Sequence, residues 1–177
     1  MIKKIHIIGG PGSGKTFLAK GLGRRLDIQE YDLDNIFWCN TKNAFGIEAE
    51  PDVRDMELNQ ALEKDEWIIE GVYGGWTRPS FKAADVIIVL QPPTAVRQWR
   101  ITRRFFRRRL LGKDHKKKET WKSFVGLLKW SKRYYAKNFP GISKQIRPFA
   151  KKTITITKPR ITVDEIISKI QDPDFAR

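Results

Sequence analysis

The chain has 177 residues, 40% of them hydrophobic, and its 35 Lys and Arg against 20 Asp and Glu give a formal net charge of +15. This length is typical of one domain with a sizeable core, and we expect residues 1–177 to form a single domain. No apolar run approaches the roughly 18 residues that a membrane-spanning helix needs, and the single cysteine, Cys39, excludes an internal disulfide and a zinc site built on paired cysteines.

Apolar runs rich in β-branched residues predict five strands, and segments with helical periodicity lie between them. The predicted strands cover residues 2–8, 27–31, 67–72, 84–90 and 153–157, and the predicted helices cover about residues 15–26, 52–65, 94–110, 119–137 and 162–171. Nearly continuous Ile and Val in strands that alternate with helices indicate a parallel sheet covered on both faces. The sequence therefore predicts an α/β fold.

The connection between the first predicted strand and the first predicted helix reads GGPGSGKT, residues 9–16. It fills every fixed position of the phosphate-loop pattern G-x-x-x-x-G-K-S/T. Glycines let the backbone curl around phosphate oxygens without Cβ atoms in the way. Lys15 can reach the β- and γ-phosphates, and Thr16 can offer a hydroxyl to Mg²⁺. We therefore predict a nucleotide site rather than a simple turn, formed by Gly9, Gly10, Pro11, Gly12, Ser13, Gly14, Lys15 and Thr16.

The second predicted strand runs into EYDLDNIFW, residues 30–38, in which Asp32 and Asp34 are two positions apart. Residues at the carboxyl end of a parallel strand face the crevice in which open α/β sheets bind ligands. One carboxylate could hold Mg²⁺ through water and the other could accept the proton of an attacking hydroxyl. The alternative is that these aspartates cap a helix. The following Phe37 could form part of an apolar wall for an acceptor, or belong to the core.

The third predicted strand ends in EGVYGGW, residues 70–76, a second glycine-rich turn. Backbone at Gly71 can approach a bound ligand closely because it carries no Cβ. Glu70 or Arg78 could then fix the polar groups of that ligand. The alternative is a tight strand-to-helix connection with a solvated Arg78.

The fourth predicted strand leads into QPPTAVRQWRITRR, residues 91–104. Phosphate-loop enzymes often place an Asp at the end of a core strand to hold the water shell of Mg²⁺. Gln91 stands there, so we expect Asp32 to supply the missing carboxylate. Arg97, Arg100 and Arg104 recur at spacings of three and four and share a helix face, where they contact phosphate or base, or remain solvated.

Most of the excess positive charge lies between residues 97 and 133, where fifteen basic and two acidic residues leave a balance of +13. Such a segment attracts polyanions, either phosphates in a cleft or a nucleic acid. Within it we predict a mobile, partly helical insertion over about residues 103–118, which would act as a lid. At the other end, the chain reaches its glycines by residue 9, too early for a signal-peptide core, so we expect a cytoplasmic protein.

The motifs GGPGSGKT, YDLDNIFW and EGVY with Trp76, followed by the arginine-rich helix, resemble those of the DNA topology modulation proteins. These are small P-loop proteins related to adenylate kinase and shikimate kinase. The resemblance extends over nearly the whole chain. It implies a three-layer P-loop NTPase fold with a five-stranded parallel sheet of order 2-3-1-4-5, as in nucleoside monophosphate kinases, and a basic lid. It also implies ATP and Mg²⁺ as cofactors.

The same resemblance implies roles for individual residues near the phosphates. Lys15 and Thr16 match the phosphate lysine and the magnesium hydroxyl of the family. Asp32 and Asp34 resemble the D-x-D of shikimate kinases, in which the first residue supports magnesium and the second meets the acceptor hydroxyl.

Arg100 stands where related kinases stack an arginine on adenine, and Arg104 stands where the lid presents an arginine to phosphate. Lys158 and Pro159 resemble the loop that closes over the other side of the base. There are two departures from the pattern: Gln91 replaces an acidic residue, and the acceptor half lacks the arginine-bearing signature by which adenylate kinases hold AMP.

These features predict an ATP-dependent kinase that transfers the γ-phosphoryl of ATP to a small hydroxyl or phosphate acceptor, such as a nucleoside, a nucleotide or a metabolite. The residues predicted to be catalytic are Lys15, Asp34 and Arg104, and those predicted to contact the acceptor are Asp34, Phe37, Gly71 and Arg78. We expect no membrane partner.

The alternative is a nucleotide-regulated nucleic-acid-binding protein that affects DNA topology. Its basis is the basic segment over residues 97–133, because aromatic residues interleaved with basic ones suit single-stranded nucleic acid. The aromatic residues in and just after this segment are Phe105, Phe106, Trp121, Trp130, Tyr134 and Tyr135. Two of them, Trp121 and Trp130, also fit one apolar face of a helix, together with Phe124, Leu127 and Leu128.

Overall fold

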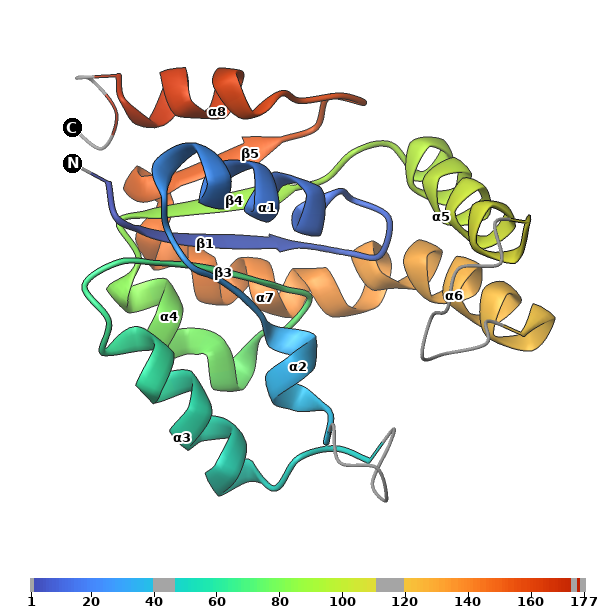
Figure 1. Ribbon diagram of the computed structural model, residues 1–177, viewed down its shortest axis with the longest axis horizontal. Helices are drawn as coiled ribbons and strands as arrows, with labels where there is room; N and C mark the ends of the chain where they lie inside the picture. The colour runs from blue at the N-terminus through green and yellow to red at the C-terminus, as the bar shows by residue number, and fades with distance from the viewer. Residues whose placement is uncertain (1, 40–46, 111–119, 173–174, 176–177) are drawn as a thin grey trace.

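Five parallel strands form one sheet in the order β2-β3-β1-β4-β5 (Figure 1). The computed structural model describes residues 2–39, 47–110, 120–172 and 175. The strands are β1 (Lys4–Gly9), β2 (Glu30–Asp32), β3 (Trp67–Gly71), β4 (Val86–Leu90) and β5 (Thr153–Ile156). This arrangement confirms the predicted α/β fold and its strand order.

Helices cover both faces of the sheet and enclose two cores (Figure 1). On one face lie α1 (Lys15–Leu26) and α8 (Val163–Ile170), where Leu18 and Ile166 pack with Ile5 and Ile7 of β1. The other face is covered by α2 (Leu33–Phe37), α3 (Pro51–Leu62), α4 (Arg78–Ala83) and α7 (Phe139–Ile146). The sheet therefore forms the middle of three layers. None of the helices in the described residues has the length and apolar composition needed to cross a membrane.

Two further helices, α5 (Thr94–Leu110) and α6 (Trp121–Arg133), pack on each other beside the carboxyl end of β1 (Figure 1). Their contact is aromatic: the ring of Phe105 stacks on that of Phe124 at 4.4 Å and lies 4.9 Å from that of Trp121. Residues 103–110 of the predicted insertion continue α5 as a regular helix. The rest of that insertion, residues 111–118, lies outside the described residues.

Two boundaries differ from the prediction for local reasons. The second strand begins at Glu30 because Asp27 ends α1 in the left-handed conformation, with φ of 58°, and the Ile28 N–H bonds to the Gly23 carbonyl. The single helix predicted over residues 119–137 is α6 followed by η2 (Tyr134–Asn138), a π-helical turn, after which α7 begins with Pro140 in its first turn. The π-turn inserts an extra residue into the helical path.

Candidate active site

The phosphate-loop motif forms a tight loop between β1 and α1. Gly12 and Gly14 have φ angles of 75° and 101°, the left-handed region that favours glycine. A Cβ at Gly12 would lie 2.6 Å from the Arg97 carbonyl oxygen, so the loop packs closely against the start of α5. The first N–H groups of α1 have no partners within the helix. The loop therefore has the backbone shape of a phosphate cradle.

The loop opens onto a pocket of about 360 Å³, within the range usual for small-molecule sites. Residues from distant parts of the chain line it: Lys15 and Thr16 of α1, Asp34 of α2, Glu70 at the end of β3, Arg100, Ile101 and Arg104 of α5, and Leu127 and Trp130 of α6. The pocket therefore brings together all three residues predicted to be catalytic: Lys15, Asp34 and Arg104.

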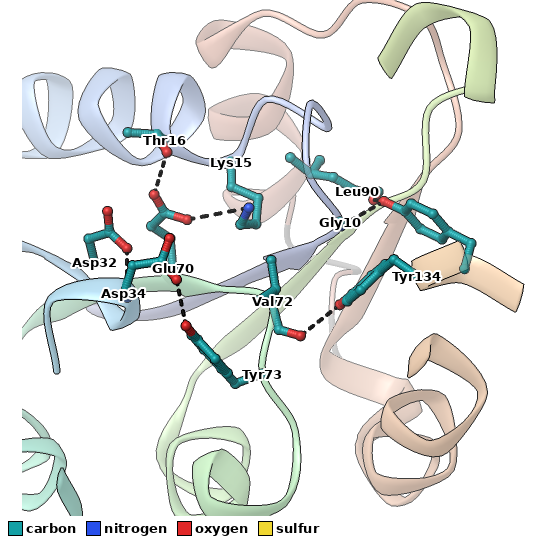
Figure 2. Close-up of polar contacts among 11 residues, drawn as sticks. Gly10, Lys15, Thr16, Asp32, Asp34, Glu70, Val72, Tyr73, Leu90 and Tyr134 are labelled. Atoms are coloured by element: carbon teal, nitrogen blue, oxygen red, sulfur yellow. Dashed lines mark hydrogen bonds and ion pairs between the residues drawn. The ribbon is translucent and has the colours of Figure 1, made fainter. Parts of the chain in front are cut away.

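Glu70 is the carboxylate that contacts the phosphate loop (Figure 2). Its Oε1 accepts a hydrogen bond from Thr16 Oγ1 at 2.5 Å, and its Oε2 lies 3.8 Å from Lys15 Nζ. The residue is only 3% exposed, and burial raises the pKa of its carboxyl, an effect that the nearby Lys15 opposes. A hydroxyl and a carboxylate oxygen side by side are ligands that suit Mg²⁺.

The sequence predicts a metal-binding carboxylate near the end of β4, where Gln91 stands, and points to Asp32 as its replacement. The sheet order offers a second candidate, because β3 as well as β4 lies beside β1, and Glu70 is the penultimate residue of β3. The signal was present in WIIEG, where one acidic residue interrupts an otherwise apolar strand. Gln91 does not line the pocket.

Asp32 caps a helix, which was the alternative considered for it. Its Oδ1 accepts a hydrogen bond from the Asp34 N–H at 2.9 Å, at the start of α2 (Figure 2). It also pairs in register with Glu70 across β2 and β3, and burial raises the pKa of its carboxyl. A role for Asp32 in holding a metal stays a prediction.

Asp34 is held by a residue that the sequence did not single out. Tyr73 Oη donates a hydrogen bond to Asp34 Oδ1 at 2.6 Å (Figure 2), and burial raises the pKa of the Tyr73 hydroxyl, which therefore remains a donor. Phe37 stacks on the ring of Tyr73, with centroids 4.6 Å apart. Phe37 therefore contacts Tyr73, the residue that orients Asp34, and does not line the pocket.

Of the other two residues predicted to contact the acceptor, Gly71 lines the pocket and Arg78 does not. Gly71 lines the pocket, and a Cβ there would lie 2.7 Å from the Leu33 side chain, so its lack of a side chain lets α2 pack on β3. Arg78 begins α4 with an exposed side chain and does not line the pocket.

Arg100 joins the phosphate loop to the loop after β5. Its Nη1 donates to the carbonyls of Gly12 and Ser13 at 3.3 and 2.7 Å, and its Nη2 donates to the carbonyl of Pro159 at 2.7 Å. Arg100 and Pro159, which the resemblance placed on either side of a base, are therefore in direct contact, and neither Lys158 nor Pro159 lines the pocket, so their role in binding the base stays a prediction. Lys158 is exposed beside them.

Arg97 has a structural environment instead. It is buried, donates to the carbonyls of Pro92 and Ser131, and lies 4.0 Å from the centre of the Tyr135 ring. Of the three arginines predicted to share one face, Arg100 and Arg104 reach the pocket and Arg97 does not.

The π-turn and the end of α6 hold the phosphate loop from behind. Tyr135 Oη accepts a hydrogen bond from the Gly10 N–H at 2.9 Å and donates to the Leu90 carbonyl at 2.6 Å. Ser131 Oγ donates to the Pro11 carbonyl at 3.0 Å, and Tyr134 Oη donates to the carbonyl of Val72 at 2.9 Å (Figure 2). These three side chains, Ser131, Tyr134 and Tyr135, are called the loop brace below.

The loop brace corrects one part of the nucleic-acid hypothesis. Tyr134 is 1% exposed, and the Tyr135 ring has its hydroxyl bonded to the phosphate loop and the Arg97 guanidinium over its face at 4.0 Å, so both rings are already engaged within the fold. Their spacing in the sequence gave no sign of this role, because a regular helix would not turn two consecutive residues toward the same glycine. A Cβ at Gly10 would lie 2.6 and 2.8 Å from the two rings.

Comparison with known proteins supports the fold. No protein-family model matches the chain. The uncharacterized protein YqaC of Bacillus subtilis (strain 168) is 30% identical over 109 residues, which are 61% of this chain and 60% of that protein. The chain therefore matches less than two thirds of the length of this relative.

Three solved structures share the architecture. The shikimate kinase of Bacteroides thetaiotaomicron is 16% identical, with a TM-score of 0.60, over 97% of this chain and 96% of that one. The shikimate kinase of Acinetobacter baumannii, solved in complex with shikimate, is 18% identical, with a TM-score of 0.61, over 96% and 91%. An uncharacterized protein of Eubacterium ventriosum is 17% identical, with a TM-score of 0.53, over 95% and 98%. The chain has the shikimate-kinase-like P-loop fold, and its resemblance to the DNA topology modulation proteins stays a prediction.

Proposed function

We propose that this protein, which has the fold of the shikimate-kinase-like P-loop proteins, is a kinase that transfers the γ-phosphoryl of ATP to a small hydroxyl or phosphate acceptor. The observation that carries the proposal is the convergence of Lys15, Thr16, Glu70 and Asp34 on one pocket. Phosphoryl transfer depends mainly on positioning and on electrostatic stabilisation, and these groups supply both. That one structural neighbour is in complex with shikimate favours a small-molecule acceptor.

The pocket fits ATP and Mg²⁺ by two observations: the glycine cradle and the paired oxygens of Thr16 and Glu70. Mg²⁺ bound to ATP would neutralise charge on the phosphates. Lys15 would hold the β- and γ-phosphates, while Thr16, Glu70 and Asp32 would hold the metal and its water shell. Arg100 with Lys158 and Pro159 would form the side of the site that receives the base.

Asp34 is the proposed base for the acceptor hydroxyl. Its carboxylate lines the pocket, and the hydrogen bond from Tyr73 at 2.6 Å limits its rotation. A base must be held within hydrogen-bond reach of the proton that it takes, and a fixed carboxylate meets that need. Arg104 would meet the transferring phosphoryl, and α5 and α6 would keep water from that side of the pocket. We propose that residues 1–177 work as a single domain, in the cytoplasm where ATP is supplied, with residues 103–118 contributing a lid.

The test is ADP formation from Mg²⁺–ATP in the presence of nucleosides, nucleoside monophosphates and small hydroxy acids. We expect one class of acceptor to stimulate turnover, and Lys15→Ala to lower the stimulated rate by about 100-fold or more, the usual cost of losing one group that stabilises the transition state. The matched control is Lys169→Ala, since Lys169 is an exposed lysine on α8. Equal stimulated rates in the two variants would refute the site.

A second candidate function rests on the outer surfaces of α5 and α6. Trp99 and Trp121 are 59% and 53% exposed, and the guanidinium groups of Arg103 and Arg109 lie 5.3 and 5.6 Å from their ring centres. Exposed rings among cations suit single-stranded nucleic acid, and we propose this surface as the basis of any effect on DNA topology. Affinity for single-stranded DNA that falls steeply as salt rises would support it, and no retention at moderate salt would remove it.

A further inference from the structure

The part of the pocket beyond the phosphate loop has an apolar wall. Leu127 and Trp130, three residues apart on one face of α6, line the same pocket as Asp34, together with Val72 after β3. Trp130 is 39% exposed although its helix packs on α5. Apolar side chains around a few polar groups are the usual composition of a small-molecule site. The apolar wall and Asp34 therefore line one and the same pocket.

The backbone that carries Trp130 is held in place by its neighbours. Ser131 is fully buried, its hydroxyl donates to the Pro11 carbonyl at 3.0 Å, and its own carbonyl accepts from Arg97 Nη2 at 3.3 Å. Tyr134, one turn later, packs edge-on against the Trp130 ring at 6.4 Å. An aromatic ring on a rigid support is preorganised for binding, since little side-chain freedom is lost on contact. Trp130 is thus a preformed platform beside the phosphate loop.

The charges around the pocket disfavour an acidic acceptor. Asp34 and Glu70 are both carboxylates, and an acidic acceptor would add negative charge beside them and beside the phosphates of ATP. Among the described residues that line the pocket, the cations are Lys15, Arg100 and Arg104. Lys15 pairs with Glu70, and Arg100 donates to three carbonyls. Arg104 is the residue proposed to contact the transferring phosphoryl.

Two further basic residues, Arg54 and Arg78, do not add positive charge to the pocket. Arg54 of α3 pairs with Asp55 at 2.9 Å and lies 4.8 Å from the centre of the Trp76 ring, and neither Arg54 nor Arg78 lines the pocket. A small hydroxy acid needs a cation to bind its carboxylate, and neither Arg54 nor Arg78 supplies such a cation to the pocket.

We infer that the acceptor is an uncharged alcohol that carries a flat unsaturated ring, the chemistry shared by nucleosides and aromatic alcohols. This inference rests on the proposed kinase function. The ring packs on Trp130 and Leu127, and the hydroxyl lies at Asp34. In the transfer, Asp34 takes the hydroxyl proton, the hydroxyl oxygen forms a bond to the γ-phosphorus, and the bond from that phosphorus to the β–γ bridging oxygen breaks, releasing ADP and the phosphate ester.

Binding can be measured apart from turnover, by saturation-transfer NMR in the presence of Mg²⁺ and a non-hydrolysable ATP analogue. The ring-bearing probes are uridine and benzyl alcohol, which separate the two sources of the ring. The controls are cyclohexylmethanol, which has a ring that is not flat, and shikimate, which is acidic. We expect at least one ring-bearing probe to bind and both controls to bind at least tenfold more weakly.

Variants of the platform test the assignment of Trp130. Trp130→Ala is expected to weaken binding of the ring-bearing probe about tenfold, and Trp130→Phe, which keeps a ring, to weaken it less than about threefold. Val125→Ala is the matched control, because Val125 is exposed on the same helix, α6, and does not line the pocket. Thermal melting and affinity for the ATP analogue establish that each variant is folded.

The outcomes separate the inference from the kinase proposal. Binding of a ring-bearing probe that depends on Trp130, with no ADP formed from ATP, would support the ring site and refute phosphoryl transfer. ADP formation with shikimate but with neither ring-bearing alcohol would support the kinase and overturn the inference. Failure of both ring-bearing probes to bind, or equal binding of cyclohexylmethanol, would also overturn it.

Discussion

Replacing Tyr135 by phenylalanine should weaken nucleotide binding from behind the phosphate loop. The Tyr135 hydroxyl is the middle of a bridge that accepts from the Gly10 N–H and donates to the Leu90 carbonyl, at 2.9 and 2.6 Å. Tyr135→Phe keeps the ring and removes only this bridge. Gly10 belongs to the loop that would wrap the phosphates, so the loss releases loop backbone without touching any proposed contact to ATP.

The expected cost follows from the two partners. A buried donor or acceptor left without a partner costs about 1–3 kcal/mol, so losing both bonds should lower the free energy of unfolding by about 2–6 kcal/mol. Tyr134→Phe is the matched control, because the Tyr134 hydroxyl donates to the Val72 carbonyl, at 2.9 Å, and not to the phosphate loop. The free energy of unfolding of that variant should fall by about 1–3 kcal/mol, the range for one unpaired group.

The two variants should also differ in nucleotide affinity. Chemical denaturation measures the free energy of unfolding, and fluorescence titration with a labelled ATP measures affinity. We expect Tyr135→Phe to bind ATP about tenfold more weakly, equivalent to about 1.4 kcal/mol, and Tyr134→Phe to stay within about twofold of the wild type. Equal affinities for ATP in the two variants would show that the bridge does not shape the loop.

Three further substitutions address the reacting groups. Asp34→Asn should keep ATP binding and lower the transfer rate by about 10²–10⁴-fold, and a normal rate would place the base elsewhere. Tyr73→Phe removes the donor that holds Asp34 and should lower kcat about tenfold with the KM for ATP unchanged; steady-state kinetics that match the wild type would contradict this. Burial raises the pKa of Glu70, so this carboxyl contributes stability that is complete below its ordinary pKa and is lost as pH rises through the raised value. The Tm of the nucleotide-free wild type, relative to that of Glu70→Gln, should therefore fall as pH rises in calorimetry, and parallel curves would refute the shift.

Much of the fold was predictable because its signals are local. A run such as VIIVL, buried along its whole length, indicates a central strand, and the phosphate-loop pattern defines the turn that follows β1. Local turn chemistry was the weak point: the left-handed Asp27 delays β2, and the π-turn divides a helix that looked continuous.

The candidate site was predictable where a motif carries it and not where the topology does. Lys15, Thr16 and Asp34 follow strands in recognisable patterns, and they line the pocket together. Glu70 gains its position from the place of β3 beside β1, which the order of strands in the chain does not reveal. Tyr135 reaches Gly10 from 125 positions away, through a helical irregularity that has no simple sequence pattern.

The contacts of Glu70 bear on the order in which ligands bind. The Thr16 hydroxyl donates a hydrogen bond to Glu70, and Lys15 lies beside the same carboxylate, so the three groups satisfy one another's charge and hydrogen-bonding needs. Free Mg²⁺ would have to disrupt these contacts and would form few new bonds. Mg²⁺ bound to ATP would bring phosphate oxygens that Lys15 can bind instead of Glu70. Metal and nucleotide should therefore bind as one complex. Free Mg²⁺ should not bind the phosphate loop at the concentrations at which Mg²⁺–ATP binds it.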